Sequence, residues 1–398
     1  MRLRNITIKQ DGDRALSHNN TVFAQLMKLV PRHEFEFLAK QHQAGSALRK
    51  MTRWSQFVAL SLAQLAGRCS LRDIVSNLNA QRSKLYHLGT GPVSRSSLAR
   101  VNEQQPPTLY EALFNQLLSR CQGLAPRHGF RFKNKLYSLD ASTIDLCLSV
   151  FPWARFRTTK GAIKLHVGVD HDGYLPTLVT VTEGKVADLT EARTLALPPG
   201  SIVVFDRGYT DYGWYNKLDN QGIAFVTRLK RNARITVAER RTVNKKSGLT
   251  CDQTIYLTGT KATACPIALR RIGYKDPETG KHYFFLANNF HLAAKTIAEI
   301  YKARWQIELF FKWIKQNLKV KSFIGTSKNA VLTQLWVAMC TYLILAYIKF
   351  ISKLGLSLQQ ILRLLHLNIF ERRDLFGLLK GDPPEPLVSP LQTRLCFS

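Results

Sequence analysis

Acidic side chains are scarce in this sequence of 398 residues. Asp and Glu total 27 against 57 Lys and Arg, so the formal net charge is +30. A protein this basic usually has a polyanionic partner, and nucleic acid is the first candidate. Because the basic residues are spread along the whole chain, they predict an extended contact surface and not a basic tail.

The chain also lacks the cysteine spacing of metal or disulfide scaffolds. Its seven cysteines are scattered and include no C-x-x-C pair. This pattern argues against a zinc ribbon and a disulfide framework, and it is typical of a reducing compartment. The first residues, MRLRNITIKQDGDR, lack the apolar core of a signal peptide, so we expect a cytoplasmic protein.

One long segment carries no charge. Residues 329–348 contain no Asp, Glu, Lys or Arg, and the run is long enough to span a membrane. It includes Asn329, Thr333, Gln334 and Thr341, which favour a buried helix in a globular core. We therefore expect no membrane partner.

Residues 1–125 are expected to form an all-helical N-terminal domain. Apolar residues recur at three- and four-residue spacing in 21–30, 54–66 and 71–78. Glycines and a proline separate these segments.

The segment 93–104, VSRSSLARVNEQ, resembles the start of a recognition helix. Ser94 is suited to cap it, and Arg95 and Arg100 are able to meet phosphates and base edges. The alternative is a plain helix that supports the next domain.

The pattern then changes to the period of two that is typical of strands. Residues 135–143 predict a strand that ends in Asp140, and 144–150 predict a second strand. The pair Asp172-Gly173 predicts a hairpin turn between 162–170 and 174–184.

The next elements alternate between helix and strand. The expected order is a helix at 187–197, a buried strand at 202–205, a helix at 211–220 and a buried strand at 223–230. This α/β order is that of a ribonuclease-H-like domain, in which the first and fourth strands lie side by side. Asp140 and Asp206 would then be neighbours at strand ends, where open sheets place their ligands.

Residues 231–292 do not fit that core and predict a strand-rich insertion. It is rich in Arg and Lys, with Tyr256, Tyr274 and Tyr283 interleaved. Such a surface suits a clamp on DNA backbone with stacking on an unpaired base. A solvated hairpin with tyrosines as cross-strand packing is the equal alternative.

The segment 296–318 predicts one long helix. Thr296 and Glu299 form a T-x-x-E capping box. One polar stripe runs along an otherwise apolar helix; its members are Tyr301, Arg304, Glu308, Lys312 and Lys315.

The stripe places one carboxylate, Glu308, among several phosphate-binding cations. This suits a two-metal phosphoryl-transfer site if other carboxylates arrive from elsewhere. The alternative is an amphipathic helix with a solvated polar stripe.

The stripe contains the pattern Y-x2-R-x3-E-x6-K, formed by Tyr301, Arg304, Glu308 and Lys315. It resembles the signature of DDE transposases of the insertion-sequence-four family, the type that includes the cut-and-paste Tn-five enzyme. The SLDAST context of Asp140 and the FDRGY context of Asp206 are similar to that family too. The resemblance spans roughly residues 20–350 and implies a catalytic domain at 126–350.

The resemblance implies a mechanism on DNA. Asp140, Asp206 and Glu308 would hold two Mg²⁺ ions, with Mn²⁺ as a substitute, for cleavage and strand transfer. Tyr301, Arg304 and Lys315 would grip phosphates, while Lys312 shares the stripe but not the signature.

The implied partners are double-stranded DNA, as terminal inverted repeats and target DNA, and a second copy in a homodimeric paired-end complex. The implied location is the nucleoid of a prokaryotic cell.

The insertion departs from related cut-and-paste enzymes, which stack a flipped base on a tryptophan. No Trp occurs between Trp214 and Trp305. Two other functions compete with an active transposase: a non-catalytic DNA-binding derivative, and a nuclease that cleaves without joining. Residues 351–398 predict a C-terminal helical tail.

Overall fold

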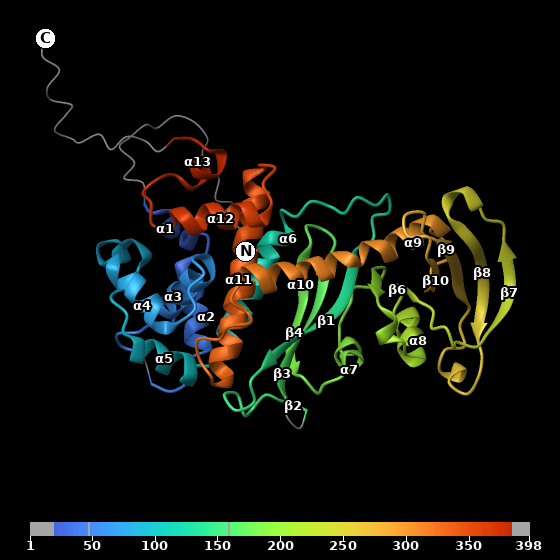
Figure 1. Cartoon of the computed structure of the whole chain (residues 1–398), viewed down its shortest axis with the longest axis horizontal. Helices are drawn as coiled ribbons and strands as arrows, with labels where there is room; N and C mark the ends of the chain where they lie inside the picture. Colours follow the sequence, from blue (N-terminus) through green and yellow to red (C-terminus); the bar gives the residue numbers. More distant parts are fainter. Residues whose placement is uncertain (1–19, 47, 158–159, 384–398) are drawn as a thin grey trace, which may run out of the picture.

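The computed structural model describes residues 20–46, 48–157 and 160–383. Helices from the first third of the chain form one side of the molecule, and a long mixed sheet extends away from them (Figure 1). Helix α11 (Lys328–Ser352) stands between the two parts, while α10 (Trp305–Asn317) and α9 (Ala294–Ala303) cross the sheet toward its far end.

The first third is helical, as predicted. Hydroxyl side chains cap several of these helices, since Thr21, Thr52, Ser70 and Ser94 each accept a backbone N–H from the first turn. The helices are α1 (Val22–Lys28), α2 (Arg32–Gln41), α3 (Arg53–Leu65), α4 (Leu71–Ala80), α5 (Arg95–Gln104) and α6 (Thr108–Gln122).

Helix α11 contains the uncharged run and is a core helix. By length and hydropathy it is able to cross a membrane, but 89% of its most apolar window is buried inside the structure. Trp336 packs against Phe114 of α6, and the Cys340 thiol donates to the Tyr110 carbonyl. The N-terminal helices and α11 therefore share one apolar core.

The C-terminal segment continues as α12 (Leu358–Asn368) and α13 (Leu375–Lys380). Ser357 and Gln360 form a capping box at the start of α12. The rest of the predicted tail, 384–398, lies outside the described residues.

The strands form one ten-stranded sheet in the order β2-β3-β1-β5-β6-β10-β9-β8-β7, with β4 paired to β3. Strands β1 and β5 are parallel neighbours, as are β5 and β6, which confirms the predicted adjacency of the first and fourth core strands. The core strands are β1 (Leu136–Leu146), β2 (Arg155–Arg157), β3 (Lys160–Asp170), β4 (Leu175–Glu183), β5 (Ile202–Phe205) and β6 (Ala224–Arg228).

The prediction of two strands around Asp140 was wrong. Strand β1 is continuous from Leu136 to Leu146 because β3 pairs with it along this whole length. Asp140 lies inside β1, at the level where the parallel pairing with β5 ends. The helix predicted at 187–197 is also shorter, α7 (Asp188–Ala192).

The strand-rich segment does not form a separate unit. Strand β10 (His282–Ala287) pairs with β6, so β7 (Ile235–Arg241), β8 (Leu249–Leu257) and β9 (Leu269–Lys275) extend the core sheet. The sequence pattern predicted the strands, but it carried no information on which core strand they join.

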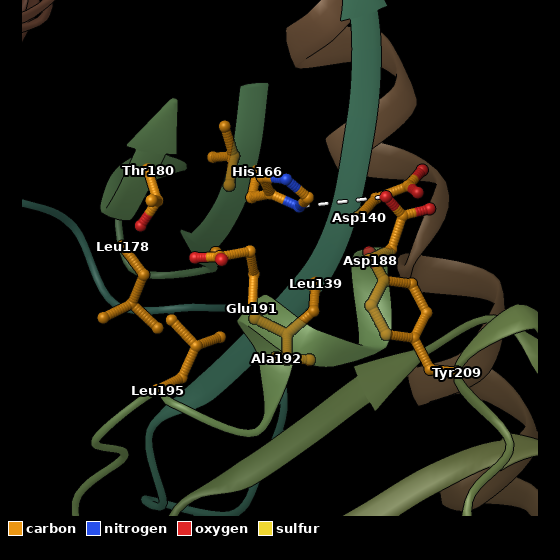
Figure 2. Close-up of a pocket in the computed structure, with 12 residues that line it drawn as sticks. Leu139, Asp140, His166, Leu178, Thr180, Asp188, Glu191, Ala192, Leu195 and Tyr209 are labelled. Carbon is orange, nitrogen blue, oxygen red and sulfur yellow. Dashed lines mark ion pairs between the residues drawn. The ribbon is translucent and has the colours of Figure 1, made fainter. Parts of the chain in front are cut away.

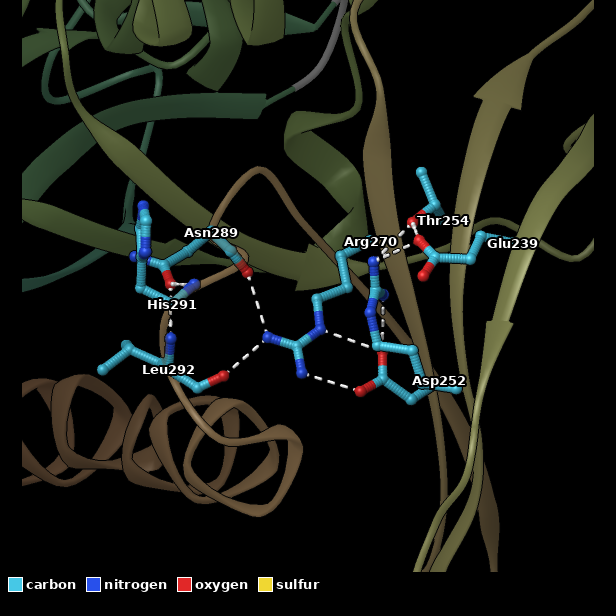
Figure 3. A network of polar contacts seen from close by, with 8 residues as sticks. Glu239, Asp252, Thr254, Arg270, Asn289, His291 and Leu292 are labelled. Carbon is cyan, nitrogen blue, oxygen red and sulfur yellow. Dashed lines mark hydrogen bonds and ion pairs between the residues drawn. The ribbon is translucent and has the colours of Figure 1, made fainter.

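A buried ion pair fixes the insertion to the start of α9. Arg270 donates to both carboxylate oxygens of Asp252, at 2.9 and 2.7 Å, and to the backbone carbonyls of Asn289 and Leu292 (Figure 3). Both side chains of the pair are only 6% exposed. The loop before α9 is thus held by hydrogen bonds to β9.

The single helix expected at 296–318 is two helices. Helix α9 starts at Ala294, and no side chain caps it, so the predicted Thr296–Glu299 box does not form. Its N-terminal loop is ordered instead by the Asn289 side chain, which accepts the N–H groups of His291 and Leu292. The break falls at Arg304, where the backbone bonds tighten to three-residue spacing.

Candidate active site

Two aspartates meet at one level of the sheet. Leu139 of β1 pairs with Phe205 of β5, and Asp140 and Asp206 are the next residue on each parallel strand. Asp140 accepts the Ala141 N–H at 2.8 Å, and Asp206 accepts the Gly208 N–H at 2.6 Å. The backbone therefore orients one oxygen of each carboxylate.

Burial raises the pKa of Asp140 to about 6. Burial is the largest cause; the Asp206 and Glu308 carboxylates also raise this pKa, while the Ala141 N–H and the Arg304 guanidinium lower it. The Asp140 side chain is thus close to both other acids and carries incompletely compensated negative charge.

Helix α10 brings Glu308 to this pair. Its apolar face packs into the core against β1 and α11 through Ile307, Phe310, Phe311 and Ile314. Glu308 points away from that core and is half-buried. Leu309, which the helical pattern placed among the apolar residues, is exposed.

Arg304 links the acids. Its Nη2 donates to Glu308 Oε1 at 2.6 Å, and its Nη1 lies 3.8 Å from Asp140 Oδ2. The side chain is 13% exposed, and its Nε has no hydrogen-bond partner. Burial opposes the charge on Arg304, but the bond to Glu308 and the nearby carboxylates raise its pKa overall.

The other members of the polar stripe differ in their surroundings. Tyr301 lies under the Arg304 guanidinium and packs on Phe285 of β10, with ring centroids 4.9 Å apart. Lys315 donates to the Thr143 carbonyl of β1 at 3.1 Å, and burial lowers its pKa. Lys312 is exposed. The structure thus gathers Tyr301 and Arg304 at the acids, while Lys315 is tied to the next part of β1.

Arg95 and Arg100 are not part of this cluster. Both are exposed on α5, in the helical part of the molecule (Figure 1). Arg95 lines a separate cleft with Arg72 of α4 and with Phe323 and Ile324. Their predicted contact with DNA stays a prediction.

Three polar residues near Asp140 were missed by sequence reasoning. His166, Asp188 and Tyr209 line one pocket with it (Figure 2). Asp188 accepts the Lys164 amine at 3.0 Å, and Nδ1 of the buried His166 lies 3.9 Å from its Oδ1. The FDRGY sequence pointed to Tyr209, but nothing local pointed to His166 or Asp188.

A second cleft opens beside Asp206. It is lined by Arg207, Gly208, Lys230, Arg231 and Asn232, at the ends of the parallel strands β5 and β6. Arg207, Lys230 and Arg231 are all exposed. Within the described part of the chain, these three cations have no carboxylate within ion-pair distance.

The donors at this edge are suited to a hard divalent cation. Asp140, Asp206 and Glu308 supply carboxylate oxygens, which are the ligands that such a cation prefers. In the described ranges, no three His, Cys, Asp or Glu side chains converge closely enough to hold a metal. The donor chemistry fits, but the Arg304–Glu308 contact occupies part of the required space.

Comparisons with known proteins show the family of the chain. Residues 131–344 match the family model described as "Transposase DDE domain", and residues 18–91 match a domain of unknown function, DUF4372. The "Putative transposase y4zB" of Sinorhizobium fredii is 32% identical over 73% of this chain and 81% of its own length. The "Probable transposase for insertion sequence element IS5377" of Geobacillus stearothermophilus is 29% identical, over 83% and 86% respectively.

Among solved structures, a piggyBac transposase synaptic complex with hairpin DNA aligns with a TM-score of 0.43 and 11% identity, over 94% of this chain and 82% of that one. This likeness is too distant to carry an argument. The family assignment rests instead on the family model and on the relatives named above. The chain belongs to the family of insertion-sequence transposases with a DDE domain.

Proposed function

We propose that this chain binds the terminal inverted repeats of its insertion sequence and cuts and joins DNA there with two Mg²⁺ ions. The observation that supports the proposal is that Arg304 contacts both Glu308 of α10 and Asp140 of β1, while Asp206 directly follows β5 at the level of Asp140. The proposed core is ribonuclease-H-like, and the proposed subgroup is the insertion-sequence-four family. Tyr301, Arg304 and Lys315 have the spacing of its signature.

The three acids are the residues that would hold the ions. Divalent cations at such a site supply polarisation of the attacking and leaving oxygens of a phosphodiester. The chain's own residues do the rest. Backbone N–H groups orient Asp140 and Asp206, and α10 presents Glu308 from a rigid, packed helix.

The DNA backbone is proposed to run along the cleft beside Asp206. Arg207, Lys230 and Arg231 are exposed there without acidic partners, so their charges are free to meet phosphates. Arg95 and Arg100 on α5 would contact DNA farther from the cut. A homodimer on paired ends would provide two such sites.

The test is cleavage of DNA that carries the element's two ends, with Mg²⁺ or with EDTA. Wild type should nick at the ends only with Mg²⁺, and Asp206→Asn and Glu308→Gln should lose cleavage but keep end binding. Retained cleavage in Glu308→Gln would remove that residue from the acidic set.

Product analysis separates the alternatives. Joined products support the transposase, whereas cleavage without joining indicates a nuclease. Tight end binding without cleavage, in wild type as in Asp206→Asn, indicates a DNA-binding derivative.

A further inference from the structure

Arg304 has two candidate partners if the proposed function holds. Its signature position assigns it to a DNA phosphate, yet in the DNA-free structure it binds the acids themselves. The 2.6 Å contact places the guanidinium against one Glu308 oxygen, and Nη1 lies 3.8 Å from Asp140 Oδ2, so a divalent cation would compete with Arg304 for these oxygens.

We propose that Arg304 is an exchangeable internal cation. It neutralises Glu308 and Asp140 while DNA is absent, and it transfers to a backbone phosphate when DNA binds, which frees both carboxylates for divalent metal. This inference rests on the proposed function and concerns the regulation of that same site.

Local structure permits this exchange. Arg304 sits at the break between α9 and α10, where the helical bonding is interrupted, so its side chain is not fixed by a regular helix on both sides. Its Nε has no hydrogen-bond partner, so the present contacts do not use the whole guanidinium. A phosphate accepts two parallel N–H bonds from a guanidinium, which compensates for the lost carboxylate contacts.

The exchange has a thermodynamic signature. If DNA releases Arg304 from Glu308, DNA raises the affinity for metal, and metal must raise the affinity for DNA by the same factor. A divalent cation and a fully charged Arg304 compete for the same oxygens in the DNA-free protein. Metal binding without DNA should therefore be weak, and the two ligands should bind cooperatively.

The first measurement is a titration of the DNA-free protein with Mn²⁺, in which the electron paramagnetic resonance signal of the free ion reports how much Mn²⁺ is bound. Arg304→Gln should bind Mn²⁺ about tenfold more tightly than wild type. Lys295→Gln is the matched control, because it removes one positive charge from an exposed i,i+4 pair with Glu299 on α9. The control should bind Mn²⁺ as wild type does.

The second measurement is the effect of Ca²⁺ on the affinity for a fluorescent DNA end. Wild type should show strong coupling, and Arg304→Gln should retain only the weak coupling that comes from neutralising the acids. Arg304→Lys keeps the charge but has no bidentate guanidinium, so its coupling should be intermediate; unchanged melting temperatures would show that the variants fold.

Equal Mn²⁺ affinity in wild type and Arg304→Gln, or coupling between Ca²⁺ and DNA that is as strong in Arg304→Gln as in wild type, would overturn the exchange. Neither result depends on cleavage. If the proposed function itself is wrong, the wild-type protein will show no Mg²⁺-dependent cleavage.

Discussion

At the scale of single residues, burial decides which charges this protein tolerates. Asp140 and Arg304 share a half-buried site and partly neutralise each other. His171, by contrast, is 2% exposed and, among the described residues, has no acidic partner at ion-pair distance. It is hydrogen-bonded to the Ser138 hydroxyl, with Nε2 and Oγ 2.7 Å apart. Burial, helped by the nearby His128, lowers the pKa of His171 to about 4.

His171 should therefore make the fold sensitive to acid. Its folded pKa lies below the ordinary value of 6.5, so the unfolded chain binds more protons between these two values. Stability should fall as pH drops from 6.5 to 4, by roughly 3 kcal/mol from this group. Urea unfolding at several pH values would measure it, and His171→Gln should lack this part of the pH dependence. An identical pH profile in the variant would contradict the assignment.

The basic cleft gives a second prediction at this scale. Lys230→Gln with Arg231→Gln should weaken DNA binding and lower the slope of log affinity against log salt by about 2. Lys217→Gln with Arg363→Gln removes the same charge from exposed positions outside the cleft. An equal change of slope in both double variants would show that the effect is general charge and not local contact.

At the scale of elements, the position of Glu308 depends on how α9 and α10 are attached. The Arg270–Asp252 pair holds the loop before α9 to β9, and the apolar face of α10 holds the other end to the core (Figures 1 and 3). The strand-rich segment is thus a support for α9 and for the helix that carries Glu308, as well as a candidate DNA surface.

Arg270→Met should loosen this attachment. It leaves Asp252 buried with only a 3.4 Å contact to Arg241, at a cost of about 3 kcal/mol. Hydrogen exchange should rise in 289–300, and Mg²⁺-dependent cleavage should fall although no acid is changed. Arg241→Gln, which mainly loses a more exposed contact to Glu239, should cost under about 1 kcal/mol. Unaltered exchange in 289–300 would show that the pair does not position α9.

At the scale of the whole molecule, α11 joins the N-terminal helices to β1 and β3 in one core, while β5, β6 and the strand-rich segment pack in two further clusters. Buried side chains from α1–α6, α10, α11, β1 and β3 belong to a single cluster. This core crosses the proposed domain boundaries at residues 125 and 350, so the segments on either side are expected to unfold together. The division into domains stays a proposal.

The shared core predicts one unfolding transition. Trp336→Ala removes a side chain that is 6% exposed and packs on Phe114, so it should cost about 3–5 kcal/mol. Protection from hydrogen exchange should fall together in α3, α6 and β1, and circular dichroism and fluorescence should report the same midpoint. Separate transitions for the helical and sheet-bearing parts would contradict a common core.

The sequence by itself determined the periodic elements and the chemistry of the site. Alternating and helical apolar spacing identified β3, β4, β5, α3 and α4, and the Asp172-Gly173 turn identified the hairpin, because these signals are local. The family resemblance predicted Arg304 and Glu308 as site residues, and the predicted strand ends pointed to Asp140 and Asp206, although β1 in fact continues past Asp140.

Only the tertiary structure decided what lies between those residues. The continuity of β1, the joining of β10 to β6 and the break at Arg304 depend on pairing and packing between segments far apart in the chain. The same tertiary pairing and packing bring His166 and Asp188 into the pocket of Asp140. The spacing of apolar residues predicts whether a segment is a helix or a strand. It does not predict which distant segment will pack against it, because the spacing is the same whatever the partner is.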